Sequence, residues 1–139
     1  MRYLLALGAL LVAFQASAQS EPTKVFVTPK NATSLSQSLT HEVRELIRAS
    51  NGLTNTDAND QALVQVSVAT LESPPGDKIV FSAVLTIGGS VKASGMYLNN
   101  FFGVCRTSDL KGCAKNIVVG IDGLATNLRS EIQAAREGT

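Results

Sequence analysis

The sequence predicts an α/β fold of the α+β type: a two-layer sandwich in the order β-α-β-β-β-α, with two helices on one face of a mixed sheet. Two segments, residues 34–50 and the chain after Ser108, carry apolar side chains at helical spacing. Four other segments are rich in β-forming residues, and two of them alternate between apolar and polar side chains. Each helix has a single apolar stripe, so placing both on one sheet face is the simplest way to bury them.

Local signals predict the first strand and the first helix. Residues 24–28, Lys-Val-Phe-Val-Thr, favour a strand that ends before Pro29. Ser34, with Gln37 three residues later, is suited to cap a helix that runs to residue 50. Asn51-Gly52 supplies a left-handed stop for this helix. Its apolar stripe consists of Leu35, Leu39, Val43, Leu46 and Ile47.

Two regular strands are expected in the middle of the chain. Residues 53–61 form a polar loop that can begin with a short edge strand. Residues 63–71 and 79–87 then alternate in the way of half-buried strands. A strand-helix-strand crossover predicts that the first two strands are parallel, and the short connections that follow predict antiparallel neighbours.

The last β segment and the last helix are less regular in sequence. Residues 91–105 form a long, looser β region, in which Gly95 and Gly103 predict a bulge or kink. Ser108 is expected to cap the final helix. The apolar stripe of that helix is unbroken. Three glycines weaken the helix locally, and we expect them to let it approach the sheet or the other helix closely.

The N-terminal segment has the three parts of a cleavable signal peptide. A short positive start precedes an uncharged apolar run at residues 4–14. Ala16 and Ala18 then form the small-residue cleavage site, so residues 1–18 are removed and the mature chain begins at Gln19. A membrane span needs about 20 apolar residues, which this run does not reach. The sequence therefore predicts a periplasmic or secreted protein with no transmembrane anchor after signal removal.

Residues 19–139 are expected to form one globular domain. Without Arg2, the 12 Lys and Arg residues become 11, which balances the 11 Asp and Glu residues. Nucleic-acid binding usually requires a clustered basic face, so this composition predicts no nucleic-acid partner. Cys105 and Cys113 are the two cysteines, and in an exported chain an even count predicts one disulfide.

Residues with catalytic potential are present but do not form a recognisable constellation. His41 is the only histidine, on the polar side of the first helix, where we interpret it as a solvated surface residue. Four acidic residues, Glu72, Asp77, Asp109 and Asp122, lie near turns or helix ends, and nothing selects a pair for acid–base chemistry. The sequence therefore predicts no enzyme, no catalytic residue, no metal site and no cofactor.

An aromatic stretch at residues 97–102 is the candidate binding region. It brings Tyr97, Phe101 and Phe102 together beside two asparagines. Aromatic residues are favoured at the centres of protein interfaces, which makes these three the candidate binding residues. The alternative is a strand whose alternate side chains face the core, which would still expose one aromatic set.

The order of elements resembles a recurring bacterial envelope domain. Residues 24–27, the serine-rich helix start at residues 34–39 and the strand at residues 62–68 carry this resemblance, which covers residues 24–90. Similar domains occur at the N-terminus of the Tol-system β-propeller protein, in curli-secretion lipoproteins and in lipoprotein activators of penicillin-binding proteins. The resemblance implies a non-enzymatic periplasmic module that docks onto envelope proteins. This chain lacks a lipidated cysteine and an attached propeller, so no family residues are carried over.

These observations favour a non-enzymatic exported protein-binding or adaptor module of the bacterial envelope, with an envelope protein as its partner. One alternative is a periplasmic immunity protein or an inhibitor of an envelope-degrading enzyme. A carboxylate-dependent hydrolase and a small-ligand carrier remain further alternatives, since a pocket between helices and sheet is not visible in a sequence.

Overall fold

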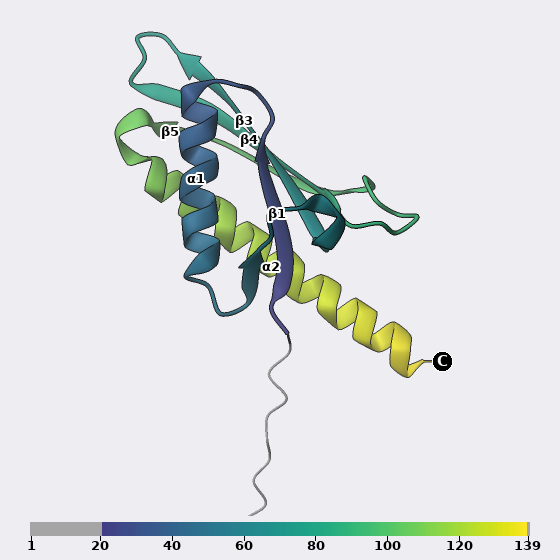
Figure 1. The fold of residues 1–139 in the computed structure, drawn as a ribbon. Coiled ribbons are helices and arrows are strands. Elements are labelled where there is room, and N and C mark those ends of the chain that lie inside the picture. Colours follow the sequence, from purple (N-terminus) through teal and green to yellow (C-terminus); the bar gives the residue numbers. More distant parts are fainter. Residues whose placement is uncertain (1–20, 139) are drawn as a thin grey trace, which may run out of the picture.

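A computed structural model describes residues 21–138 of the chain. The predicted signal peptide and its cleavage residues Ala16, Ala18 and Gln19 lie outside this part. The elements in chain order are β1 (Thr23–Pro29), α1 (Ser34–Arg48), β2 (Leu53–Asn55), the 3-10 turn η1 (Asn59–Gln61), β3 (Val64–Ser73), β4 (Lys78–Ile87), β5 (Tyr97–Arg106), the 3-10 turn η2 (Thr107–Asp109) and α2 (Leu110–Glu137) (Figure 1).

The five strands form one mixed sheet in the order β2-β1-β3-β4-β5. The pairs β1–β2 and β1–β3 are parallel, whereas β3–β4 and β4–β5 are antiparallel. Both helices contribute to one core against the same sheet face, so the predicted two-layer α/β sandwich is confirmed. The short edge strand at residues 53–55 is present, and the predicted parallel and antiparallel relations hold.

The first helix forms nearly as expected but starts and stops by different means. Thr33, rather than Ser34, is the N-cap, and its hydroxyl accepts a hydrogen bond from the Ser36 backbone N–H at 3.2 Å. The helix ends at Arg48 with a right-handed C-cap at Ala49, so the predicted left-handed stop at Asn51-Gly52 is not used. Its buried face carries Leu39, Val43 and Ile47.

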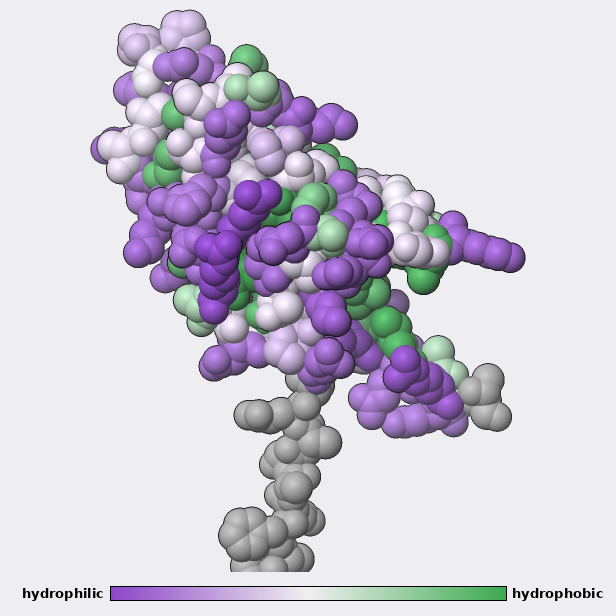
Figure 2. All heavy atoms as spheres, in the orientation of Figure 1, coloured by the Kyte–Doolittle hydropathy of each residue, from purple (hydrophilic) through white to green (hydrophobic). Residues whose placement is uncertain are grey.

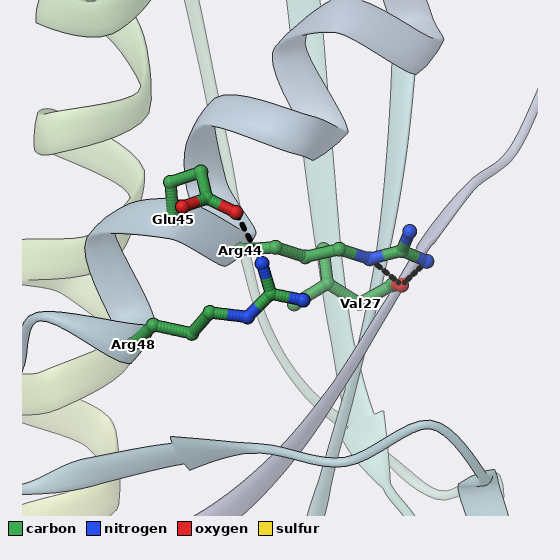
Figure 3. A network of polar contacts seen from close by, with 4 residues as sticks. All are labelled: Val27, Arg44, Glu45 and Arg48. Carbon is green, nitrogen blue, oxygen red and sulfur yellow. Dashed lines mark hydrogen bonds and ion pairs between the residues drawn. The ribbon is translucent and has the colours of Figure 1, made fainter.

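The β1 side of the sheet is closed by β2 and by groups from α1. β2 pairs only with residues 23–25 of β1, and the Thr56 N–H then donates to the Val25 carbonyl at 2.9 Å. Farther along this edge, Arg44 donates from Nε and Nη2 to the Val27 carbonyl at 3.1 and 2.6 Å (Figure 3). A strand edge left unpaired can bind another chain, so these contacts protect this side of the sheet.

The connection between β4 and β5 differs from the prediction. The β region expected at residues 91–105 begins only at Tyr97, because residues 88–96 form turns in which Gly89 and Gly95 adopt positive φ angles of 79° and 82°. The register shifts once, opposite Leu85 and Thr86. Gly103 marks no bulge: a Cβ there would lie 3.0 Å from the Phe81 ring, so the glycine leaves room for that ring.

Helix α2 is held against β5 by a disulfide and by one close contact. Asp109, rather than Ser108, caps the helix by accepting from the Gly112 N–H at 3.1 Å. Cys105 in β5 and Cys113 in α2 form the predicted disulfide. About two turns farther along α2, Gly120 lies so close to Phe101 that a Cβ there would come within 2.5 Å of the ring. The expected close approach through a glycine is therefore confirmed at this position.

Two glycines of α2 offer a matched test of this contact. Replacing Gly120 with Ala should lower the free energy of unfolding by about 1–3 kcal/mol, because the Phe101 ring must move. Replacing Gly123 with Ala should raise it by roughly 0.5–1 kcal/mol, because nothing lies within 4 Å of the added Cβ and alanine favours helix. Thermal denaturation of the two variants compares them directly, and a stabilised Gly120→Ala variant would contradict the contact.

Candidate functional site: the open sheet face and strand β5

The helices cover one face of the sheet, and no element of the described residues covers the other. In β4, Ile79, Phe81 and Leu85 are buried beneath the helices. Val80 and Val84, which alternate with them, point to the opposite face. Hydrophilic residues cover most of α1 on the side drawn in Figure 2, so the outer surface of the helical layer has the character of ordinary solvated surface.

The alternation of β5 divides the predicted aromatic residues between the two faces. Phe101 is paired with Ala83 on the helix side, where it packs against the core and Gly120. Phe102, paired with Ser82, lies on the open face with 77% of its surface exposed. Tyr97 lies on the same face, 59% exposed, and its hydroxyl donates to Asn100 Oδ1 at 2.7 Å. The structure thus brings Tyr97 and Phe102 to one surface and leaves Phe101 out of it.

Exposed apolar side chains gather on the open face around Phe102. Leu71, Val80 and Val104 stand in one row across β3, β4 and β5, because Leu71 pairs with Val80 and Val80 pairs with Val104. Their exposed fractions are 71%, 43% and 64%. Phe102 lies in the next row on β5. We call these four residues the open-face cluster.

Two cations border the open-face cluster. Lys78 and Arg106 are directly paired across β4 and β5, and both are exposed. Within residues 21–138, neither of these two cations has a carboxylate oxygen within 4 Å, in contrast to Arg48, which forms an ion pair with Glu45 (Figure 3). Like charges directly opposite each other on a sheet are unfavourable, and a carboxylate placed between them would relieve the repulsion.

Sequence reasoning missed Leu71, Val80 and Val104 as surface residues. A signal was available, because the strand at residues 79–87 carries valines at positions where a half-exposed strand normally has polar residues. The pairing of Lys78 with Arg106 could not be seen, since the two residues are 28 positions apart in the sequence and meet only through the register of β4 with β5.

Other concave sites offer less chemistry. An open hollow of about 490 Å³ lies at the start of β1, between Thr23, the turn at Gly88-Gly89 and Arg129 of α2. His41 lines a shallow hollow on α1 beside Gln37 and Glu42. In the described part of the chain, no three His, Cys, Asp or Glu side chains are grouped closely enough to hold a metal ion. None of the described helices combines the length and the apolar character that membrane crossing requires.

Comparison with known proteins identifies solved structures that are similar in fold, but no protein that is similar in sequence. No protein-family model matches the chain, and no curated protein matches it. A hypothetical protein from Chlamydia trachomatis is similar in structure, with a TM-score of 0.53 and 9% identity over 76% of this chain and 98% of that chain. At this identity the likeness shows a shared fold.

Two further solved structures match with lower scores. PelC from Paraburkholderia phytofirmans, a dodecamer, has a TM-score of 0.49 and 17% identity over 74% of this chain and 86% of that chain. A minor lipoprotein from Acinetobacter baumannii has a TM-score of 0.36 and 15% identity over 82% of this chain and 94% of that chain. The specific resemblance to Tol, curli-secretion and penicillin-binding-protein-activator domains stays an expectation.

The two adjacent phenylalanines should respond differently to the same substitution. Phe101→Ser should lower the free energy of unfolding by about 2–4 kcal/mol, because it removes a ring packed on Gly120 and the core. Phe102→Ser should change it by roughly 0.5 kcal/mol or less, because that ring is mostly exposed. Urea denaturation of both variants measures the difference, and equal losses would mean that the strand does not present its faces as described.

Proposed function

We propose that the chain is an exported, non-enzymatic protein-binding module of the bacterial envelope, and that it binds its partner through the open sheet face. The observation that carries this proposal is the open-face cluster, four large apolar side chains that no other part of residues 21–138 covers. Contiguous exposed apolar surface on a soluble domain is a mark of an interaction site. A rigid sheet also holds these side chains in fixed positions, which lowers the entropy that binding costs.

The composition of the surface fits recognition of a protein. Phe102 supplies the most exposed side chain of the open-face cluster, and large aromatic side chains are enriched among interface hot spots. Lys78 and Arg106 add positive charge at its border. We therefore expect the partner to present an apolar patch with a carboxylate beside it, since complementary charge raises the association rate and excludes wrong partners.

Two features support placement outside the cytoplasm. The N-terminal segment has the pattern of a signal peptide, and disulfides such as Cys105–Cys113 persist mainly in oxidising compartments. In the periplasm such a bond would hold the start of α2 on the end of β5, so that the helix layer keeps the sheet in shape while the open face binds.

The proposal is tested by capture of partners from native envelope extract with a tagged chain that starts at Gln19. Leu71→Ser should reduce the amount of the dominant captured protein roughly 10- to 100-fold, because an interface loses about 1.5–3 kcal/mol with a buried leucine. Val119→Ser is the matched control: Val119 is 64% exposed but lies on α2, away from the open face. Equal capture by both variants and the parent chain would argue against the open face as the binding surface.

A further inference from the structure

Strand β5 is the edge of the sheet, and no strand among residues 21–138 lies on its outer side. It pairs with β4 on one side, and the sheet order ends with it. The strand is ten residues long and contains no proline. Long, uncovered edges of this kind are templates for pairing with another chain, so natural proteins usually block them.

The backbone groups that face outward can be identified. Thr107 donates its N–H to the Asp77 carbonyl at 3.0 Å, which makes residues 107 and 77 a hydrogen-bonded pair. Because such pairs alternate along antiparallel strands, the N–H and C=O groups of Asn100, Phe102 and Val104 point away from β4. The Asn100 N–H is bound by the Asn99 side chain at 2.8 Å, as expected for an outward group. Within residues 21–138, no other group bonds the outward N–H of Phe102 or Val104.

The two sides of the sheet differ in how fully their outward backbone groups are hydrogen-bonded. On the β1 side, β2, the Thr56 N–H and the Arg44 guanidinium together occupy the exposed carbonyls of Val25 and Val27. On the β5 side, Asn99 is the one described residue that provides such a cover, and it binds a single N–H, that of Asn100. Within the described residues, the outward backbone N–H groups of Phe102 and Val104 therefore remain without a hydrogen-bond partner.

Helix α2 leaves space beside the outer edge of β5. An open hollow of about 630 Å³ lies between the end of β5 and the first turns of α2, with Val104 and Arg106 on one wall and Gly112 and Asn116 on the other. The first turns of α2 therefore leave the outer side of residues 104–106 uncovered.

We infer that the outer edge of β5 pairs antiparallel with β5 of a second copy of this chain. The strand is complementary to itself in this arrangement, because Arg106, at its end, is its only charged residue. With Phe102 at the two-fold axis, each Arg106 lies four residues from the axis, so the two are roughly 26 Å apart and screened from one another. Phe102 then stands opposite its symmetry mate, and Asn100 stands opposite Val104.

This pairing gives a symmetric dimer with one continuous sheet made of the five strands of each copy. The helices of both copies lie on the same side, and the two open-face clusters become neighbours on the other side. The inference goes beyond the proposed function, because the dimer forms through backbone groups of the edge whether or not a partner occupies the open face. The contact is small, so we expect a dimer that dissociates at micromolar concentrations.

The test is the mass of the oxidised chain from Gln19, measured by sedimentation equilibrium over a wide concentration range. The expected result is a monomer–dimer equilibrium. Val104→Pro should weaken dimerisation at least tenfold compared with Val104→Ala, because both replace the β-branched valine side chain but only proline removes the outward N–H. A monomer at all concentrations, or equal dimerisation of the two variants, would overturn the inference.

Two further measurements keep this result interpretable. If Val104→Pro does not fold, Val104→Lys places two new charges along the shared edge and should give the same loss of dimer. Amide exchange of Phe102 and Val104 should slow as the protein concentration rises, and unchanged exchange in a dimer would place the contact elsewhere. Leu71→Ser should dimerise normally, since Leu71 lies two strands from the edge. Failure of partner capture and failure of dimerisation are thereby separate outcomes.

Discussion

The architecture depends on the packing of both described helices, α1 and α2, on the same face of a five-stranded sheet. α1 lies against the parallel strands β1 and β3. The Cys105–Cys113 disulfide and the Phe101–Gly120 contact hold α2 on β5. Burial of apolar surface is the main stabilising contribution to folding, and here it is concentrated on one side of the sheet. The other side is left to solvent and is free to carry a function.

Because the core lies on the helix side of the sheet, the apolar residues of the open face contribute little to the free energy of unfolding. Their neighbours in sequence, such as Phe81 beside Val80 and Phe101 beside Phe102, fill the core instead. Large apolar side chains on an exposed antiparallel face are unexpected from packing alone, since that face normally carries polar residues. Lys78 and Arg106 also repel each other across β4 and β5. A partner that buries the apolar side chains and places a carboxylate between the two cations would therefore stabilise this surface.

The sequence predicted most of the fold because the relevant signals are local. Alternation located residues 63–71 and 79–87 correctly, and helical spacing located both helices. The helix caps were misplaced by one residue each, because Thr33 and Ser34, like Ser108 and Asp109, are neighbours with similar capping ability. The site was predicted only in part: the aromatic stretch was found, but which aromatic faces solvent depends on the register with β4, as does the row that joins Leu71 to Val104.

The central claim is that β5 presents Phe101 to the helices and Phe102 to solvent, on a sheet with one uncovered face. Hydroxyl-radical footprinting of the free, oxidised chain, with the modified residues located by tandem mass spectrometry, tests this claim most directly. The account predicts rapid oxidation of Phe102 and Leu71, and protection of Phe101 and of the buried Phe81. Similar oxidation rates for Phe101 and Phe102, or protection of Leu71 and Phe102 in the free chain, would contradict it.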